Sequence, residues 1–196
     1  MAIDPSHFHL YNVIDTCSVW NLLSSRRFYL TARSAGCFFC CTEFVYYECL
    51  HKPRKSPTQE SIELQNRFRE EFEKGGFPKY NLDIEDLLEI EVLENRRKLN
   101  KGKLSSIAFA KKTRQAFLTD DQKARQLAEE VMEPRMAQTI PHLFGWLYFT
   151  YRLNDADKDL IINEHKKLNL ILAKYFEEMY QKTLAYRLTL KHSKNT

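Results

Sequence analysis

Three short apolar runs, each followed by a helical pattern, constrain the fold of this chain more than any other feature. The runs are 10–14 (LYNVI), 37–41 (CFFCC) and 116–119 (AFLT). Each is too short for a helix and does not alternate with polar residues, which is typical of a strand buried on both faces of a sheet. Strands that alternate with helices through short loops form a doubly wound sheet. The sequence therefore predicts an α/β fold of three layers with a central, mostly parallel sheet.

The rest of the pattern is helical, with two weaker strands. Residues 154–196 read as helices only, so we expect one domain at 1–153 and a C-terminal helical extension at 154–196. The extension has an apolar stripe at helical spacing that should pack on the domain or on a partner, and its last residues, LKHSKNT, should fray. The stripe residues are Leu168, Leu172, Tyr175, Phe176 and Met179. The expected helices are 18–30 (capped by Thr16 or Ser18), 43–51 (capped by Thr42), 57–74, 84–99 (capped by Asp83), 103–112, 122–132 and 142–153, and the weaker strands are 80–82 and 136–140.

Composition limits the class of protein. Hydrophobic residues make up 43% of the 196 residues, with 13 Phe and 10 Tyr, which excludes a disordered chain. The net charge of +4 is too mild to indicate nucleic-acid binding without local clusters. No stretch reaches the roughly 18 apolar residues of a membrane span, and the N-terminal residues lack the pattern of a secretory signal. We expect a cytoplasmic protein without membrane association.

The five cysteines raise the question of a zinc site. Four of them crowd into GCFFCCTEFVYYECLH, close to His51. Zinc sites usually pair two ligand couplets on turns, whereas these thiols lie in an apolar run without a second couplet. We favour small buried apolar side chains on a strand, and the odd number argues against a disulfide framework. The cysteines are Cys17, Cys37, Cys40, Cys41 and Cys49.

Acidic residues follow two of the predicted strands. Asp15 ends the first, and Asp120 and Asp121 end the run 116–119. The carboxyl ends of parallel strands line the ligand crevice of an open sheet, and Glu48, in the apolar context FVYYECL, can lean toward it. Gathered carboxylates repel one another unless a cation neutralises them, and oxygen ligands suit Mg²⁺ or Mn²⁺. Two simpler interpretations stay open: Asp15 as a helix cap and Glu48 as a solvated surface residue.

At these residues the chain resembles a known family. The segments VIDTCSVWNLL, FVYYECL, KGKLSSIAFA and AFLTDDQKARQLA, spread over residues 10–150, look like the four signature segments of PIN domains, the metal-dependent ribonucleases of bacterial toxin–antitoxin systems. The resemblance implies a PIN-like fold in which Asp15, Glu48 and Asp121 hold one or two Mg²⁺ or Mn²⁺ ions for RNA hydrolysis. Asp120 is the alternative to Asp121, and the hydroxyls of Thr16 and Ser18 are candidates to orient the first Asp or the substrate.

The third segment departs from the family pattern. Where PIN domains often have Gly-Glu, this chain has Gly102-Lys103, and Ser105 and Ser106 are not acidic either. An ammonium there repels a cation and can occupy one metal position itself. A one-metal site, altered activity and a degenerate PIN-like domain that binds RNA or protein without cleavage therefore all remain open. Glu94 is a candidate to compensate for the missing acid.

Cations and aromatic residues near these segments suit an RNA substrate. The loop with Lys52, Arg54 and Lys55 is the strongest candidate to bind phosphates, and Lys103 is a further candidate. Trp20, Tyr46 and Tyr47 could stack bases, but their apolar neighbours favour core positions. Our first hypothesis is an endoribonuclease, the toxin of a toxin–antitoxin or defence system. The expected partners are RNA and an antitoxin or another protein, with homodimer formation as a further option. The other cationic clusters are Arg26-Arg27, Arg96-Arg97-Lys98, Lys101/Lys103 and Lys111-Lys112/Arg114.

Overall fold

The protein folds around a sheet of five parallel strands. The structure, a computed structural model, describes residues 4–193, so the last three residues of the polar tail lie outside it. The strand order is β3-β2-β1-β4-β5, and every neighbouring pair is parallel. This confirms the predicted α/β fold, including the two weaker strands. The strands are β1 (Tyr11–Ile14), β2 (Phe38–Thr42), β3 (Lys79–Tyr80), β4 (Ala116–Leu118) and β5 (Ala137–Gln138).

Helices cover both faces of the sheet, so the fold has three layers. Within residues 4–193 they are α1 (Thr16–Leu23), α2 (Arg26–Ser34), α3 (Glu43–Leu50), α4 (Gln59–Glu73), α5 (Ile84–Arg96), α6 (Lys101–Thr113), α7 (Gln122–Val131), α8 (Ile140–Phe149), α9 (Asp155–Lys167) and α10 (Ala173–Ser193).

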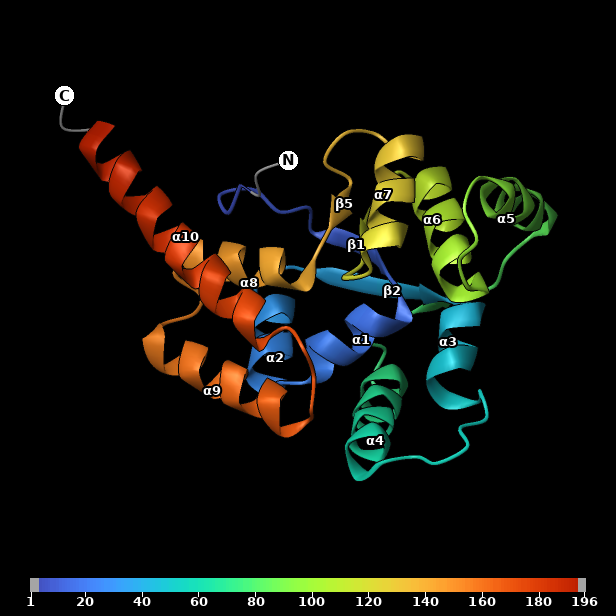
Figure 1. Cartoon of the computed structure of the whole chain (residues 1–196), viewed down its shortest axis with the longest axis horizontal. Coiled ribbons are helices and arrows are strands. Elements are labelled where there is room, and N and C mark those ends of the chain that lie inside the picture. The colour runs from blue at the N-terminus through green and yellow to red at the C-terminus, as the bar shows by residue number, and fades with distance from the viewer. Residues whose placement is uncertain (1–3, 194–196) are drawn as a thin grey trace.

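Alternate residues of the strands divide the core into two clusters. Val13 and Phe117 pack with α5, α6 and α7, whereas Ile14 and Leu118 pack with α1, α2, α4 and α8. Both sets of side chains are buried, which explains why the strand sequences are apolar without alternation. In Figure 1, α5, α6 and α7 lie on one side of the sheet, and α1, α2 and α4 lie on the other.

The segment expected as one helix at 18–30 forms two helices. Arg67 donates from Nη1 to the carbonyl oxygens of Leu23 (2.9 Å) and Ser24 (2.9 Å), so these carbonyls do not continue α1. Ser25 then caps α2 by accepting from the backbone N–H of Phe28. The cap of α1 is Asp15, not Thr16 or Ser18. The caps expected at Thr42 and Asp83 are confirmed.

The C-terminal helix α10 packs on α8, and α9 packs on α10 and α2. Leu172, Phe176 and Met179 of the expected stripe are buried, but Tyr175 is exposed and does not belong to it. Gly145 of α8 allows close approach, since a Cβ atom there would lie 2.5 Å from Cγ of Met179. Figure 1 shows α10 crossing α8 and extending beyond the body, at the end away from α5.

The structure also tests the burial predicted for the cysteines and for three aromatic residues. Cys37, Cys40, Cys41 and Cys49 are buried, as expected of small core side chains. Trp20 and Tyr46 pack partly buried against the core, but Tyr47 is exposed, so its prediction as a core residue is wrong. No helix within residues 4–193 combines the length and the apolar character needed to cross a bilayer.

Candidate functional site at the carboxyl ends of β1 and β4

The candidate site lies where the strand order changes direction. The chain moves from β1 toward β2 and β3 on one side, and then returns to place β4 and β5 on the other. Ligands of open α/β sheets bind outside the carboxyl ends of the strands at such a switch point. Asp15 directly follows β1, and its backbone N–H donates to the carbonyl of Leu118 at the end of β4 (3.3 Å). The acids after both strands therefore share one edge of the sheet.

Asp15 is fully buried and held by neighbouring donors. Its Oδ1 accepts from the backbone N–H of Ser18 (2.9 Å), and its Oδ2 accepts from the hydroxyl of Thr119 (2.7 Å). The thiol of Cys17 donates to the same carboxylate, 3.0 Å from Oδ1. Burial, together with the charge of Asp15, raises the pKa of Cys17 and keeps this thiol protonated. Asp15 thus caps α1 and also links β1 to β4.

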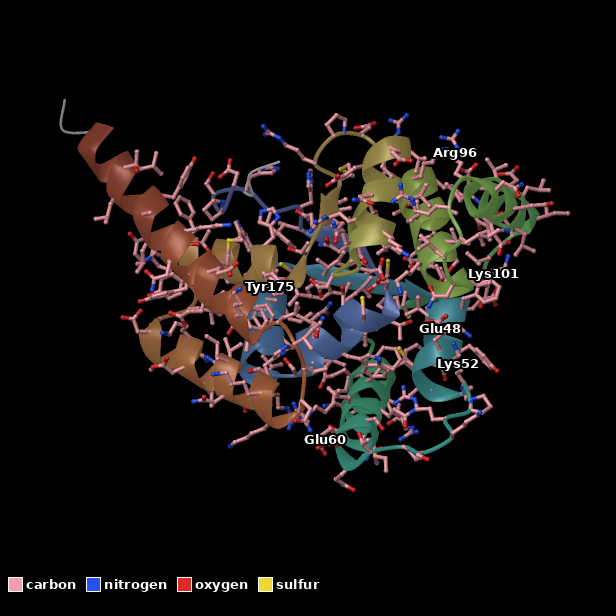
Figure 2. All side chains as sticks on the ribbon, viewed as in Figure 1. Glu48, Lys52, Glu60, Arg96, Lys101 and Tyr175 are labelled. Atoms are coloured by element: carbon pink, nitrogen blue, oxygen red, sulfur yellow. The ribbon has the colours of Figure 1, made fainter. Side chains whose placement is uncertain are left out.

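Glu48 leans from α3 toward the start of α6. Its Oε2 accepts from the hydroxyl of Thr16 (2.5 Å), the residue after Asp15. Its carboxylate lies against Gly102, where a Cβ atom would be 2.6 Å from Oε2. Figure 2 labels Glu48 on α3, below Lys101 at the start of α6. This position agrees with the prediction that Glu48 leans toward the crevice at the carboxyl ends of the strands.

The two adjacent acids after β4 point to different neighbours. Asp121 caps α7 by accepting from the backbone N–H of Ala124 (2.8 Å), and its Oδ2 lies 3.6 Å from Nζ of Lys103. Asp120 instead accepts from the side chains of Asn21 (2.8 Å) and Ser18 (3.1 Å) and from the backbone N–H of Ile140 (3.0 Å). Asp121 is therefore the member of the pair that faces Lys103.

Asp120 loses most of its contact with water. Burial raises the pKa of its carboxyl to about 6, and the hydrogen bonds from Asn21, Ile140 and Ser18 only partly offset that effect. Its contacts connect the β4–α7 junction to α1 and to the start of α8. These contacts give it a structural role beside the site.

Lys103 is the positive charge among these carboxylates. Its side chain is 17% exposed. Burial lowers the pKa of Lys103, but the negative charges around it, Asp15, Asp121 and Glu48 among them, outweigh burial and raise it. The amine is therefore an ammonium ion at neutral pH. Three acidic side chains thus act on a single lysine.

The structure also gives the surroundings of the other candidate residues, Arg54, Lys52, Lys55 and Glu94. Arg54 lies over the ring of Trp20, 5.5 Å from its centroid, and not beside the carboxylates. Lys52 and Lys55 form no ion pair within the described residues. Glu94 pairs with Lys101 (2.7 Å), so it does not replace the missing acid.

Three residues of the site were not found from the sequence. Thr119 orients Asp15, Asn21 holds Asp120, and Gly102 accommodates Glu48. Ser105 and Ser106 are buried and structural: Ser105 shares a 2.7 Å hydrogen bond with Thr42, and Ser106 donates to the carbonyl of Gly102 (2.8 Å). The position of Thr119 immediately before the acidic pair was a usable signal, whereas nothing in the sequence links Asn21 to Asp120.

The carboxylate oxygens of the site are suitable ligands for a divalent cation, but the side chains are not arranged to surround one. Carboxylate oxygens are the ligands that Mg²⁺ and Mn²⁺ prefer, and an ammonium already serves as the local cation. As the side chains lie, no group of three or more His, Cys, Asp or Glu within residues 4–193 could hold a metal ion. A bound ion would require Lys103 to move away from the carboxylates.

In comparisons with known proteins, neither a family model nor a curated protein matches this chain.

Proposed function

We propose that this chain is a PIN-type ribonuclease domain that hydrolyses RNA phosphodiesters with one bound Mg²⁺ or Mn²⁺ ion. The observation that carries the proposal is the convergence of Asp15, Glu48 and Asp121, from three separate elements, around the ammonium of Lys103 at the switch point. Three acidic side chains outnumber the one lysine, and their oxygens are the ligands that a divalent ion of this kind prefers. Lys103 takes the place of the acid that a second ion would need. A cytoplasmic location, where RNA is made and translated, belongs to the same proposal.

Each residue has a defined part in this proposal. Asp15 and Asp121 would hold the ion, and Glu48 would complete its ligands or hold the attacking water, with Thr16 and Gly102 setting its orientation. When bound, such an ion lowers the pKa of water and polarises a phosphoryl oxygen. Lys103 would then contact a non-bridging phosphate oxygen, because an ammonium and a phosphate form a strong charge-assisted hydrogen bond. The cations of Lys52 and Lys55 would bind flanking phosphates.

The second candidate function is RNA binding without cleavage. It is favoured by the ammonium of Lys103, which lies 3.6 Å from Asp121, and by the finding that no group of three or more His, Cys, Asp or Glu within residues 4–193 is placed to hold a metal ion. In this case Lys103 would act as a permanent internal counter-ion, and the protein would need no metal. An antitoxin or other protein partner, and the toxin role itself, stay predictions of the family resemblance under both functions.

Asp121→Asn tests the nuclease directly. Asn and Asp cap helices about equally well, so the variant should keep the stability of the wild type and lose the charge beside Lys103. We expect end-labelled single-stranded RNA to be cut by the wild type with Mn²⁺, and cleavage by Asp121→Asn to fall at least tenfold. Asp159→Asn, which changes an exposed acid on α9, is the matched control. Cleavage that persists in EDTA would disprove metal dependence, and binding without cleavage would favour the second candidate.

Lys103→Glu separates the two functions. In the nuclease it restores an acid to the site, so the affinity for Mn²⁺ should rise at least tenfold and cleavage should increase, because removal of the ammonium favours cation binding. In the binding domain it removes a phosphate contact, so RNA binding should weaken without any cleavage. Calorimetric titration of Mn²⁺ into both proteins measures the difference. Equal affinities would mean that Lys103 does not border a metal site.

A further inference from the structure

A cavity of about 300 Å³ lies between α1, the start of α4 and the connection between α9 and α10. Its volume falls at the lower end of the range of roughly 300–1,000 Å³ that is usual for small-ligand sites. Most of its lining is apolar, with a few polar side chains, which is the usual make-up of such a site. The apolar residues include Trp20, Leu64 and Leu168, and the polar ones include Arg54, Glu60 and Asn169.

The indole of Trp20 and the guanidinium of Arg54 form a pair in this lining. Arg54 lies over the indole, 5.5 Å from the ring centroid. Trp20 in turn packs edge-to-face with buried Phe68 of α4, with the ring centroids 6.2 Å apart, which fixes its ring. Arg54 makes no ion pair within residues 4–193, so its charge is available to a ligand. Unpaired nucleic-acid bases stack on aromatic rings and on guanidinium planes, so a base is the ligand that this pair suits.

Glu60 contributes a carboxylate to the same lining. It lies in the first turn of α4, and its Oε1 accepts from Nδ2 of Asn169 (2.8 Å), in the connection between α9 and α10. The N–H of Glu60 itself, the hydroxyl of Thr58 and the amide of Asn169 hold the pKa of this carboxyl below its usual value, so it is ionised at neutral pH. An ionised carboxylate accepts hydrogen bonds and donates none, and it pairs with the amino group of cytosine. A base with an amino group therefore suits the cavity better than uracil, which has carbonyl oxygens instead.

We propose that this cavity holds an unpaired base of the RNA substrate, stacked on the pair of Arg54 and Trp20, with an exocyclic amino group toward Glu60. The bases with such a group are adenine, cytosine and guanine, and uracil is the base that the cavity disfavours. This base preference rests on the proposed ribonuclease function, to which it adds a rule for where the RNA is cut.

The cavity and the carboxylates of the candidate site share the helix α1. Trp20 follows Thr16 by four residues, which is about 6 Å along the helix axis, and the hydroxyl of Thr16 donates to Glu48 (2.5 Å). The α3–α4 loop lines the cavity and also carries Lys52 and Lys55, the cations proposed to bind flanking phosphates. Figure 2 labels Lys52 near Glu48. The base held in the cavity therefore determines which phosphodiester of the same strand reaches the carboxylates.

Binding of CMP and UMP to the protein in EDTA tests the cavity without cleavage. The two bases differ at one position, where cytosine has an amino group and uracil a carbonyl oxygen. In Trp146→Phe the only tryptophan left is Trp20, so quenching of its fluorescence reports stacking. We expect CMP to bind with a dissociation constant of roughly 1 mM and UMP to bind at least about fivefold more weakly. Calorimetric titration of the wild type gives the same comparison if the substitution disturbs the core. No binding of CMP up to roughly 10 mM, or equal affinities for the two nucleotides, would overturn the proposal.

Two conservative substitutions separate the contact with the amino group from the stacking. Glu60→Gln keeps an acceptor for Asn169 but loses the charge, so the affinity for CMP should fall to about that for UMP. Arg54→Lys keeps the positive charge but loses the flat guanidinium, so both nucleotides should bind more weakly. The control is Glu73→Gln, which makes the same change at an exposed position at the other end of α4 and should alter neither affinity. A ratio of the two affinities that stays the same in Glu60→Gln would overturn the role of this carboxylate.

Cleavage of poly(C) and poly(U) with Mn²⁺ distinguishes failure of the cavity from failure of the nuclease. If both proposals hold, poly(C) should be cut at least about fivefold faster than poly(U) at low RNA concentration. Selective binding of CMP without cleavage of either polymer would refute the nuclease and leave the base site standing. Equal cleavage of both polymers, with no binding of either nucleotide, would refute the base site and leave the nuclease standing.

Discussion

At the residue scale, the position of the Glu48 carboxylate requires a glycine at residue 102, because a side chain there would occupy the same space. Gly102 lies in the first turn of α6, and any Cβ atom there would approach Oε2 of Glu48 to 2.6 Å and Cδ to 2.8 Å. Such distances are too short for non-bonded atoms, so Glu48 would have to turn away. Because its carboxylate is the far end of a flexible side chain, the movement would cost little stability. Gly102 therefore affects the site more than the fold.

Gly102→Ala should separate activity from stability. Alanine is better than glycine in a helix by up to about 1 kcal/mol, so the melting temperature should stay the same or rise. The displaced carboxylate should reduce Mn²⁺-dependent RNA cleavage at least tenfold, close to the effect of Glu48→Gln. Melting curves and cleavage rates measured on the same preparations check both parts. A less stable protein with unchanged cleavage would show that Glu48 has no part in the reaction.

The acids of the site could be predicted from the sequence because each follows a recognisable strand or lies in an apolar context. Glu48 reaches the hydroxyl of Thr16, the residue after Asp15. The choice between Asp120 and Asp121 could not be made, because the donors that hold Asp120, Asn21 and the N–H of Ile140, come from distant parts of the chain. Contacts made only in the folded protein decide such details.

At the scale of elements, the break between α1 and α2 depends on two later helices. Ser24 accepts at its carbonyl from Arg67 of α4, and its hydroxyl lies 2.9 Å from Nδ1 of His165 in α9. Nε2 of His165 accepts from the backbone N–H of Leu172 (3.0 Å), the residue directly before α10. The expected helix at 18–30 was therefore too long, because the contacts that Ser24 makes at the break come from residues far away in the sequence. Capping residues such as Thr42 and Asp83 were predictable because a cap acts on its own helix.

His165 should make the stability of the protein depend on pH. Burial lowers its pKa to about 4, below the value of about 6.5 in an unfolded chain. The stabilising contribution is therefore complete above about pH 6.5 and is lost as the pH falls toward 4, at up to about 1.4 kcal/mol per pH unit. Urea unfolding at pH 7, 5.5 and 4.5 should show this slope in the wild type and not in His165→Gln.

The comparison with His165→Gln is needed because the titration of Asp120 changes the stability of the protein with pH in the opposite direction. Its folded pKa of about 6 is raised above its unfolded value, so its contribution is complete below about pH 4 and is lost as the pH rises through 6. Both proteins contain Asp120, so the difference between their unfolding free energies isolates His165. A difference that does not change with pH would show that His165 is protonated to the same extent in the folded and unfolded states.

At the scale of the whole molecule, the cations that suit RNA lie at the end of the molecule opposite α10. The α3–α4 loop, with Lys52 and Lys55, follows the helix that carries Glu48, and Figure 2 labels Glu48 and Lys52 close together. The net charge of +4 is small, so attraction of RNA must come from this local group. Arg54, although in the same loop, packs over Trp20 and contributes to structure as well.

Lys52→Glu combined with Lys55→Glu should weaken RNA binding and flatten its dependence on salt. Each phosphate contact that is lost reduces the slope of log K against log[salt] by about 0.7 for single strands, so the pair should lower it by roughly 1.4. Fluorescence anisotropy at several KCl concentrations measures the slope. Lys174→Glu combined with Lys182→Glu makes the same change on α10 and should leave the slope unaltered. The loop would be ordinary solvated surface if both double variants retain the slope of the wild type.

The strand order also determines when, during synthesis of the chain, the site can exist. β1 is made early, yet its neighbour β4 follows roughly a hundred residues later, so their pairing is strongly non-local. The carboxylate of Asp15 has no hydrogen bond from the Thr119 hydroxyl until Thr119 has been synthesised. Asp120 likewise has no hydrogen bond from the N–H of Ile140 until that residue has been added. Until then the acids belong to an incomplete sheet and cannot act together. A nuclease of this design would stay inert toward the messenger and the ribosome that produce it until nearly all of its α/β body has been translated.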